Sequence, residues 1–305
     1  MKTKDWLAFI LLGLVWGSSF LWIKIAIAEV GPFLLVALRL LFGILTLLAV
    51  IAVTRPVWPK DRRVWLSLTF LGVINNALPY VLISWGEKFI DSAVAAILNS
   101  TTPLFTMVVA HLLLSDDRMN RGRLLALFTG FAGILILFGR DANNGFEGSL
   151  VGKGAVLLAA VFYAFASVYA RRTTKGLAPA VQAIVPLLGA DLLLWGAAPI
   201  VEAPLTLPRL PITWLAIVWL GVIGVAVAYL LFFYLLHSIG PTRTTLVTYV
   251  FPLVGVALGV LFLNERLDWN LIGGTILIVG SIMIVNRKPA LPAGKELGTP
   301  NARHV

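Results

Sequence analysis

The residues of this chain that offer polar chemistry lie in the middle of apolar stretches. Residues 99–106 read NSTTPLFT, inside an apolar run from Ser92 to Leu114. Their amide and hydroxyl groups are neutral hydrogen-bonding partners. Pro103 has no N–H to donate to the carbonyl four residues earlier, so it frees the carbonyl of Asn99. This stretch therefore indicates hydrogen bonding to a neighbouring group or to a polar solute.

A second proline repeats this pattern in a later apolar run, where Pro252 frees the carbonyl of Thr248. Each proline alone is compatible with a packing kink whose hydroxyl groups bond back to their own helix. Asn99 and Thr102, three residues apart, share one helical face. Two prolines at equivalent positions favour a pair of hinges, Pro103 and Pro252, beside a polar cavity.

Other residues near the middle of apolar runs are aromatic or amide side chains, which suit a cavity for a polar or amphipathic solute. The predicted substrate-binding residues are Trp16, Ser19, Asn75, Tyr80, Asn99, Thr102, Tyr163, Tyr229, Tyr234, Thr248 and Tyr249. Trp16 and Tyr163 are interpreted as cavity walls, with contact to lipid or to the protein core as the alternative. Of the adjacent pair Asn75 and Asn76, one is expected to hydrogen-bond a neighbouring helix.

Two charged side chains fall well inside apolar runs, where a charge costs about 2.5–3.5 kcal/mol to insert. Asp191 must be neutral, paired or in contact with water, and proton coupling is the functional hypothesis for it. Arg39 is expected either to meet a substrate carboxylate or to hydrogen-bond neighbouring carbonyl groups. Lys24, near the end of a run, is expected to extend its ammonium group to the membrane surface.

The composition indicates that a membrane surrounds these residues. Of 305 residues, 59% are hydrophobic and 12% are charged, whereas a soluble domain has about 25% charged residues. The mean hydropathy is +0.95. Ten apolar runs are long enough to cross ~30 Å of hydrocarbon as helices. They cover residues 6–28, 33–54, 64–85, 92–114, 123–139, 151–171, 180–201, 212–236, 243–263 and 269–286. The predicted fold class is an all-α membrane protein with ten transmembrane helices.

Charges in the loops predict the orientation of these helices. Alternate loops are rich in Lys and Arg, and the rich side faces the cytoplasm under the positive-inside rule. The rich side carries Lys2, Lys4, Arg55, Lys60, Arg62, Arg63, Arg118, Arg121, Arg123, Arg171, Arg172, Lys175, Arg243, Arg287, Lys288, Lys295 and Arg303. The poor side carries Lys88, Arg140, Lys153, Arg209 and Arg266. Both termini are therefore predicted to be cytoplasmic, and the net charge of +10 reflects this topology rather than nucleic-acid binding.

The two halves of the chain resemble each other. Residues 65–104 align without a gap on residues 214–253, so that Tyr80 matches Tyr229. Chance similarity between apolar sequences is the alternative. Because each half has five helices, an odd number, the second half must enter the membrane from the opposite face. The predicted domains are two inverted five-helix repeats, 1–140 and 150–286, and a disordered tail, 287–305. Such a pair of repeats can open alternately to each face.

The sequence disfavours several other functions. Without cysteine there is no disulfide or thiolate metal site, and the three histidines lack the spacing of metal ligands. No phosphate-binding loop or hydrolase motif is present, so no cofactor is expected. An integral-membrane enzyme would cluster catalytic residues, and a channel would show rings of charge. Neither pattern is found, and the chain is predicted not to be an enzyme.

Longer motifs resemble one known family. LLGLVWGSSFLWIKIAI, LRLLFG, AAILNSTTPLFTMVVAHLLLSDD and YVFPLVGVALGVLFLNERLDWNLIGGTILIVG are similar to the EamA family of the drug/metabolite transporter superfamily, as two tandem units. The resemblance implies a secondary transporter with a central cavity between the halves. By motif, the resemblance assigns to that cavity Trp16, Asn99, Thr102, Tyr163, Tyr229 and Tyr249. Glu265, in the NER motif, is interpreted as a structural residue at a helix end.

The resemblance implies export of small metabolites such as amino acids by alternating access, in the cell (inner) membrane. Uptake of sugars or of nucleotide-sugar-like solutes is the alternative. The expected partners are a small-molecule substrate and the lipid bilayer, without nucleic acid. The chain is expected to act as a monomer or a homodimer.

Overall fold

The structure, a computed structural model, describes residues 2–114, 119–140 and 146–285. Within these ranges every regular element is a helix, which confirms the predicted all-α membrane class. The predicted disordered tail, 287–305, lies outside the described residues and stays a prediction.

The first half of the chain crosses the molecule five times. Its helices are α1 (Thr3–Ala26), α2 (Pro32–Thr54), α3 (Arg62–Gly72), η1 (Val73–Ala77), α4 (Leu78–Gly86), α5 (Ser92–Asn99), α6 (Thr102–Leu113) and α7 (Arg121–Gly139). Segments α3, η1 and α4 form one continuous pass, and α5 and α6 form another. A proline begins α2, a position where its missing N–H would have no helical partner in any case.

The second half also makes five passes. Its helices are α8 (Phe146–Thr173), α9 (Pro179–Val201), α10 (Pro211–Val218), η2 (Trp219–Val227), α11 (Ala228–Ser238), α12 (Pro241–Thr244), η3 (Thr245–Tyr249), α13 (Val250–Leu263) and α14 (Trp269–Val285). Segments α10, η2 and α11 form one pass, and η3 and α13 form another. Prolines begin α9 and α10, as one begins α2.

Nine helices of the described chain are long and apolar enough to cross a membrane. The tenth pass, α14, is apolar and has 17 residues in its described part. The ten predicted passes are therefore confirmed.

Lys153 corrects the predicted loop assignment. It lies within α8 and is 1% exposed, and its ammonium group donates to the carbonyl of Leu137 at 2.8 Å. The apolar run read from the sequence begins at residue 151, but the helix already begins at Phe146. Lys153 is therefore part of the packed interior and does not report on loop charge.

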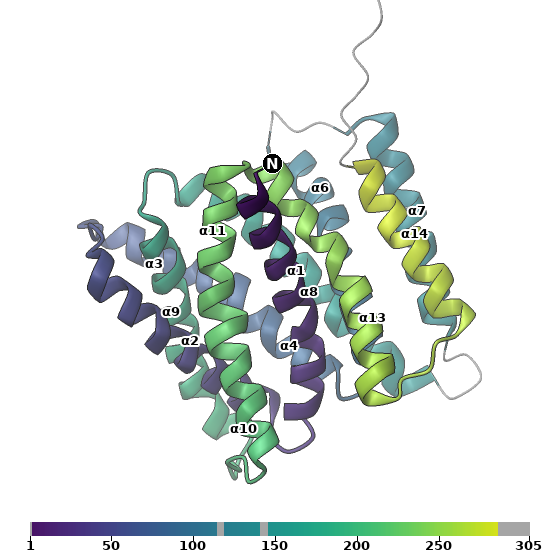
Figure 1. The fold of residues 1–305 in the computed structure, drawn as a ribbon, viewed down its shortest axis with the longest axis horizontal. Coiled ribbons are helices and arrows are strands. Elements are labelled where there is room, and N and C mark those ends of the chain that lie inside the picture. The colour runs from purple at the N-terminus through teal and green to yellow at the C-terminus, as the bar shows by residue number, and fades with distance from the viewer. Residues whose placement is uncertain (1, 115–118, 141–145, 286–305) are drawn as a thin grey trace, which may run out of the picture.

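The two halves enter the membrane from opposite faces. α1 begins at the face where α14 ends, here called the N-terminal face (Figure 1). The end of α1 lies at the other face, here called the far face, where Lys24 donates to the carbonyl of Ile90 at 2.8 Å. α8 begins at the far face, because a Cβ at Gly152 would lie 2.8 Å from the carbonyl oxygen of Gly86 at the end of α4. The duplicated halves are thus inverted, as predicted.

Each half places one glycine against the backbone of the other half. A Cβ at Gly72, the last residue of α3, would lie 1.9 Å from the carbonyl oxygen of Pro186 in α9. At the equivalent position of the second half, a Cβ at Gly221 in η2 would lie 2.5 Å from the carbonyl oxygen of Arg39 in α2. Small residues let membrane helices approach closely, and these two contacts are related by the internal duplication.

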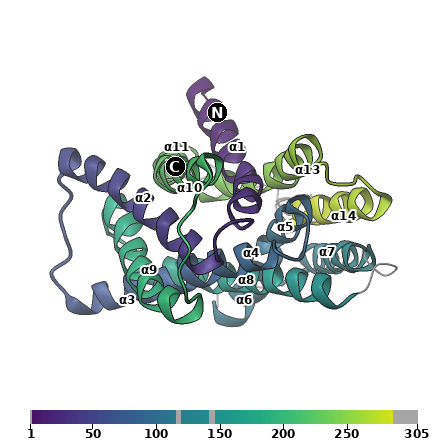
Figure 2. The same ribbon diagram turned by 90° about the horizontal axis from the view of Figure 1, so that it is seen from below.

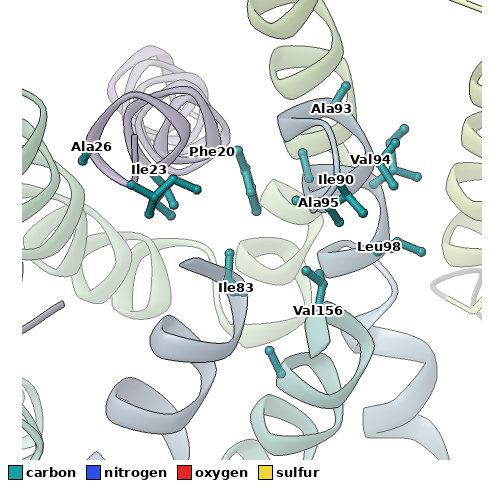
Figure 3. Packing of buried hydrophobic residues seen from close by; sticks show 14 of the residues in the cluster. Phe20, Ile23, Ala26, Ile83, Ile90, Ala93, Val94, Ala95, Leu98 and Val156 are labelled. Atoms are coloured by element: carbon teal, nitrogen blue, oxygen red, sulfur yellow. The ribbon is translucent and has the colours of Figure 1, made fainter. Parts of the chain in front are cut away.

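The helices form an elongated arrangement in the plane of the membrane. Seen from below, α2, α3 and α9 lie together at one end, and α7 and α14 lie side by side at the other (Figure 2). Between them an apolar core collects side chains from α1, α4, α5 and α8. Figure 3 shows Phe20, Ile83, Ala95 and Val156 from these four helices in this core. Helices of both halves therefore share one interior.

Regular helix geometry is interrupted at matching places in the two halves. η1 and η2 are π-helical segments in the middle of the third and eighth passes. The fourth pass breaks between α5 and α6, next to Pro103, and the ninth contains the 3-10 segment η3 shortly before Pro252. Such interruptions free backbone groups and frequently occur at functional sites. The candidate site is therefore expected around these four interruptions.

Candidate functional site

Polar contacts between the halves converge on the π-helical segments. Nδ2 of Asn76, on η1, donates to the hydroxyl of Tyr229 in α11 at 2.9 Å. The carbonyl of Gly224, on η2, accepts from Nε1 of Trp16 in α1 at 3.2 Å. A π-helical turn displaces backbone carbonyls from their usual partners, so Gly224 presents one to a neighbouring helix. Each of these bonds joins one half of the chain to the other.

Arg39 and three tyrosines lie beside these contacts. Arg39 is 4% exposed, and its guanidinium carbon lies 4.1 Å from the centre of the Tyr80 ring. The phenol groups of Tyr163 and Tyr229 lie near Tyr80 and Arg39. We call this set the central cluster, which comprises Trp16, Ser19, Arg39, Asn76, Tyr80, Tyr163, Gly224 and Tyr229.

The structure distinguishes the two adjacent asparagines. Asn76 is fully buried and bonds Tyr229 of the other half, as expected for one of the pair. Its Oδ1 is enclosed without a hydrogen-bond partner in the described chain. Asn75 is half-buried on the same segment, and its assignment to substrate binding stays a prediction.

The carbonyl freed by Pro103 already has a partner. Thr102 donates its hydroxyl to the carbonyl of Asn99 at 2.7 Å, and Thr106 donates to the carbonyl of Thr102 at 2.9 Å. These hydroxyls thus bond within their own pass, which is the alternative that the sequence left open. The amide oxygen of Asn99 differs, because it is enclosed and has no partner among the described residues. Asn99 therefore remains a candidate through its side chain.

Three other predicted binding residues form their polar contacts away from the central cluster. Tyr249 donates its hydroxyl to the carbonyl of Ile282 in α14 at 2.5 Å. Thr248 donates to the carbonyl of Thr245 in its own pass at 2.9 Å. Tyr234 is 44% exposed and bonds α1 near the N-terminal face. Their roles in substrate binding stay predictions, as does the hinge role of the two prolines.

Asp191 lies in α9 and is 8% exposed. Its Oδ1 is enclosed and has no hydrogen-bond partner in the part of the chain that the structure describes. The next residue, Leu192, is 78% exposed, so a neighbouring side of α9 borders the lipid. Proton coupling through Asp191 stays a prediction.

Carboxylates of one half cap helix ends of the other half at the far face. Glu202, at the end of α9, accepts from the backbone N–H groups of Phe33 and Leu34 at 2.8 and 3.0 Å. Glu29, after α1, accepts from the N–H of Leu210, just before α10, at 3.1 Å. The start of a helix has unpaired N–H groups and partial positive charge, which stabilise a carboxylate. Each cap therefore joins the two halves.

Two more polar contacts join the halves at the far face. Glu265, after α13, accepts from the N–H groups of the first two residues of α5 at 2.7 and 2.9 Å, which matches its interpretation as a structural residue. Arg140, after α7, pairs with Asp91 at 2.7 Å and with Asp268 at 2.5 Å. We call the contacts of Glu29, Glu202, Glu265 and Arg140 the far-face ties.

At the N-terminal face, the polar links between the described residues are of another kind. Asp5 accepts from the hydroxyls of Ser238 and Tyr234 at 2.5 and 3.2 Å, and Arg172 donates to the carbonyl of Leu113. Among the helix ends that the structure describes at this face, none is capped by a carboxylate of the opposite half. Among the described residues, the carboxylate caps that join the two halves therefore lie at the far face.

Glu87 is a buried acid that could not be recognised from the sequence. It directly follows α4, is fully buried, and has no hydrogen-bond partner for either carboxylate oxygen in the described chain. Burial raises the pKa of its carboxyl well above the ordinary value of 4.5, although the positive charge of Lys24 opposes this shift. The ammonium group of Lys24, which was expected to extend to the membrane surface, donates to the carbonyls of Glu87 and Ile90 at the far face.

Replacing Glu87 by glutamine is expected to make the stability of the protein less dependent on pH. An acid whose pKa is raised by folding stabilises the fold fully below its ordinary pKa of 4.5, and this contribution is lost as the pH rises. Between about pH 5 and about pH 8 the melting temperature in detergent should fall for the parent chain and fall less for Glu87→Gln. Asp61→Asn, at an exposed helix start, is the control and should follow the parent. Identical pH dependence of Glu87→Gln and the parent would contradict this account.

Two features of the described residues bear on cofactor binding: an apolar hollow and the spacing of possible metal ligands. A hollow of about 260 Å³ lies between α13 and α14, lined by apolar residues such as Val256 and Leu271. Such walls suit lipid rather than a polar solute. In the described ranges, no three His, Cys, Asp or Glu side chains gather as metal ligands do.

Ten apolar passes, two inverted halves and a polar cluster at their junction define a membrane transporter. The chain belongs to the EamA-like transporter family, whose sequence profile matches residues 4–139 and 150–287. The resemblance found in the sequence is thus confirmed, with one match for each half. As a member of a transporter family, the protein is not an enzyme.

Curated relatives are similar in sequence to nearly the whole chain. It is 24% identical over 282 residues to the uncharacterized transporter YoaV of Bacillus subtilis, which covers 92% of this chain and 96% of the relative. It is 27% identical over 291 residues to the uncharacterized inner membrane transporter YedA of Escherichia coli, covering 94% and 92%. A probable amino-acid metabolite efflux pump of Escherichia coli is 25% identical over 294 residues, covering 93% and 95%.

A crystal structure of another protein shares the fold. The two chains superpose with a TM-score of 0.66 at 22% sequence identity, and the match covers 93% of this chain and 97% of the other. At this identity the likeness concerns the fold alone. It supports the arrangement of all ten passes in a multi-pass membrane protein.

Proposed function

We propose that this protein exports small amino-acid-related metabolites across the cell membrane by alternating access. The observation that carries the proposal is a polar cluster built from both halves, on a molecule whose halves are also joined by carboxylate caps at the far face. In this proposal the repeats 1–140 and 150–286 rock against each other, and the far-face ties part when the far face opens. The solute binds at the central cluster between these two movements.

The substrate class is supported by chemistry and by relatives. The central cluster combines aromatic surfaces with amide, hydroxyl and guanidinium groups, which suits a small amphipathic solute. A relative of this chain is named a probable amino-acid metabolite efflux pump. The Lys- and Arg-rich loops favour a cytoplasmic N-terminal face, so the far face would open to the outside of the cell.

The proposal is tested by counterflow in proteoliposomes that contain the purified protein. Vesicles loaded with unlabelled solute should accumulate radiolabelled leucine, phenylalanine or threonine, and should not accumulate radiolabelled glucose. Accumulation of glucose alone would favour the alternative, sugar uptake. Absence of counterflow with all three amino acids would contradict the proposal.

Removing the hydroxyl of Tyr229 is expected to slow this counterflow. Tyr229→Phe loses the hydrogen bond from Asn76, which contributes about 0.5–1.5 kcal/mol. A loss of about three- to tenfold in rate at normal expression is expected. Tyr169→Phe is the matched control, because Tyr169 packs edge-on against Phe70 outside the central cluster. Equal rates for both variants would remove Tyr229 from the site.

A further inference from the structure

Arg39 places a positive charge in the interior of the membrane-spanning part. It lies two turns into α2, which begins at Pro32, and is 4% exposed. A guanidinium group stays protonated in proteins, and a charge near the middle of a membrane helix costs about 2.5–3.5 kcal/mol. Such a buried cation calls for an anionic partner.

The chain itself supplies no such partner in its described residues. No hydrogen bond or ion pair to the Arg39 guanidinium is found there, and its Nε is enclosed without a partner. The ring of Tyr80, 4.1 Å away, covers one face of the group and leaves its N–H edge unused. Glu87 lies near Arg39 as well as Lys24, but neither of its carboxylate oxygens forms a hydrogen bond with a described residue.

A glycine leaves room for about one methyl group beside the guanidinium group. A Cβ at Gly224 would have no neighbour closer than the hydroxyl oxygen of Ser19, at 3.5 Å, and would lie 3.8 Å from Nη2 of Arg39. Three residues earlier, a Cβ at Gly221 would lie 2.5 Å from a backbone carbonyl. Gly221 therefore marks close packing, whereas Gly224 leaves a gap of about methyl size next to a hydroxyl and a guanidinium group.

We propose that Arg39 binds the carboxylate of the transported solute. The edge of a guanidinium group matches a carboxylate through two parallel N–H···O bonds. The enclosed Oδ1 of Asn76, which has no partner in the described chain, is an acceptor of the kind that an ammonium group requires. The solute class is therefore an amino acid or a related carboxylic acid. This inference rests on the proposed function, because it names the chemical group by which the exported metabolite is recognised.

The experiment compares solutes that differ only at the carboxylate. Counterflow of radiolabelled leucine and phenylalanine is measured beside that of leucinamide and phenylalaninamide, in which a neutral amide replaces the carboxylate. The parent protein should exchange each amino acid at least about tenfold faster than its amide, because a site built for a polar group rejects the analogue without it. Protection of the purified protein against thermal unfolding by the same four solutes measures binding without transport.

Variants of Arg39 connect this preference to the guanidinium group. Arg39→Gln should bring the ratio of leucine to leucinamide counterflow close to one. Arg39→Lys keeps the charge but not the paired N–H groups, so its ratio should fall between those of the parent and of Arg39→Gln. Arg62→Gln, which removes a positive charge from the exposed start of α3, is the matched control and should keep the parent ratio.

The outcomes separate this inference from the proposed function. Equal exchange of amino acids and their amides by the parent protein would overturn the role of Arg39 while leaving amino-acid-related export intact. An unchanged preference in folded Arg39→Gln would overturn it as well. If no amino acid exchanges, the proposed function fails. The role of Arg39 is then tested by the protection of the purified protein against thermal unfolding. Protection by leucine but not by leucinamide supports it, and equal or absent protection overturns it.

Discussion

Gly72→Ala is expected to destabilise the protein strongly, although it adds only one methyl group. The new Cβ would lie 1.9 Å from the carbonyl oxygen of Pro186, a backbone atom that cannot move without shifting α9. Overpacking of this kind costs about 3 kcal/mol or more. The melting temperature of the detergent-solubilised protein should fall by roughly 6–12 °C, with a larger aggregated fraction on size-exclusion chromatography.

Gly196→Ala is the matched control for this substitution. Gly196 lies on α9, the same helix as Pro186, and a Cβ there would have no neighbour within 4 Å. Its melting temperature should stay near that of the parent. Gly221→Ala should fall between the two, because its Cβ would lie 2.5 Å from the carbonyl oxygen of Arg39. Similar melting temperatures for Gly72→Ala and Gly196→Ala would show that α3 and α9 are not in contact.

Glu265→Ala is expected to open the far face. Its carboxylate accepts two charge-assisted hydrogen bonds at the start of α5, and each such bond contributes about 1.5–3 kcal/mol. The chain has no cysteine, so Ser92→Cys, at a fully buried position, gives a single reporter thiol. Its labelling by a membrane-impermeant maleimide should be at least about tenfold faster in the Glu265→Ala background, which corresponds to about 1.4 kcal/mol.

A helix cap that does not join the halves provides the control. Asp61 accepts from the backbone N–H of Arg63 at 2.8 Å, within the start of its own helix. Asp61→Ala should therefore leave the labelling of Ser92→Cys unchanged. Glu265→Gln keeps an acceptor without the charge and should give an intermediate rate. Equal labelling with and without Glu265 would mean that this contact does not hold the far face closed.

The central cluster could be predicted only in part. Trp16, Tyr80, Tyr163 and Tyr229 stand out because a large aromatic side chain in the middle of an apolar run needs a partner for its N–H or O–H group. Glu87 has no such signal, because GEKFID reads as an ordinary loop between two passes. Its burial depends on how α1, α5 and the chain after α13 close over it.

The prolines illustrate a second limit. Pro103 does free the carbonyl of Asn99, as its chemistry requires. The sequence left open whether a solute, water or a neighbouring group would bond that carbonyl. The hydroxyl of Thr102, three residues away, is close enough to do so. Local chemistry thus identified the freed group but not its partner, because the partner depends on side-chain conformation.

The sequence by itself determined the number of passes and the inversion of the halves. Apolar length sets how many helices cross the membrane, and an odd number of helices in each repeat reverses the second one. These are properties of consecutive residues, so periodicity and composition report them directly.

Only the tertiary structure decided which residues of one half contact which residues of the other half. The cap of Glu265 on α5 and the bond between Asn76 and Tyr229 each join residues more than 150 positions apart. Lys24 was expected at the membrane surface, but its partners there, such as the carbonyl of Ile90, could not be predicted. Such contacts arise from which helices lie side by side, and in a membrane almost any apolar helix face can pack against another. Hydropathy therefore does not distinguish one neighbour from another.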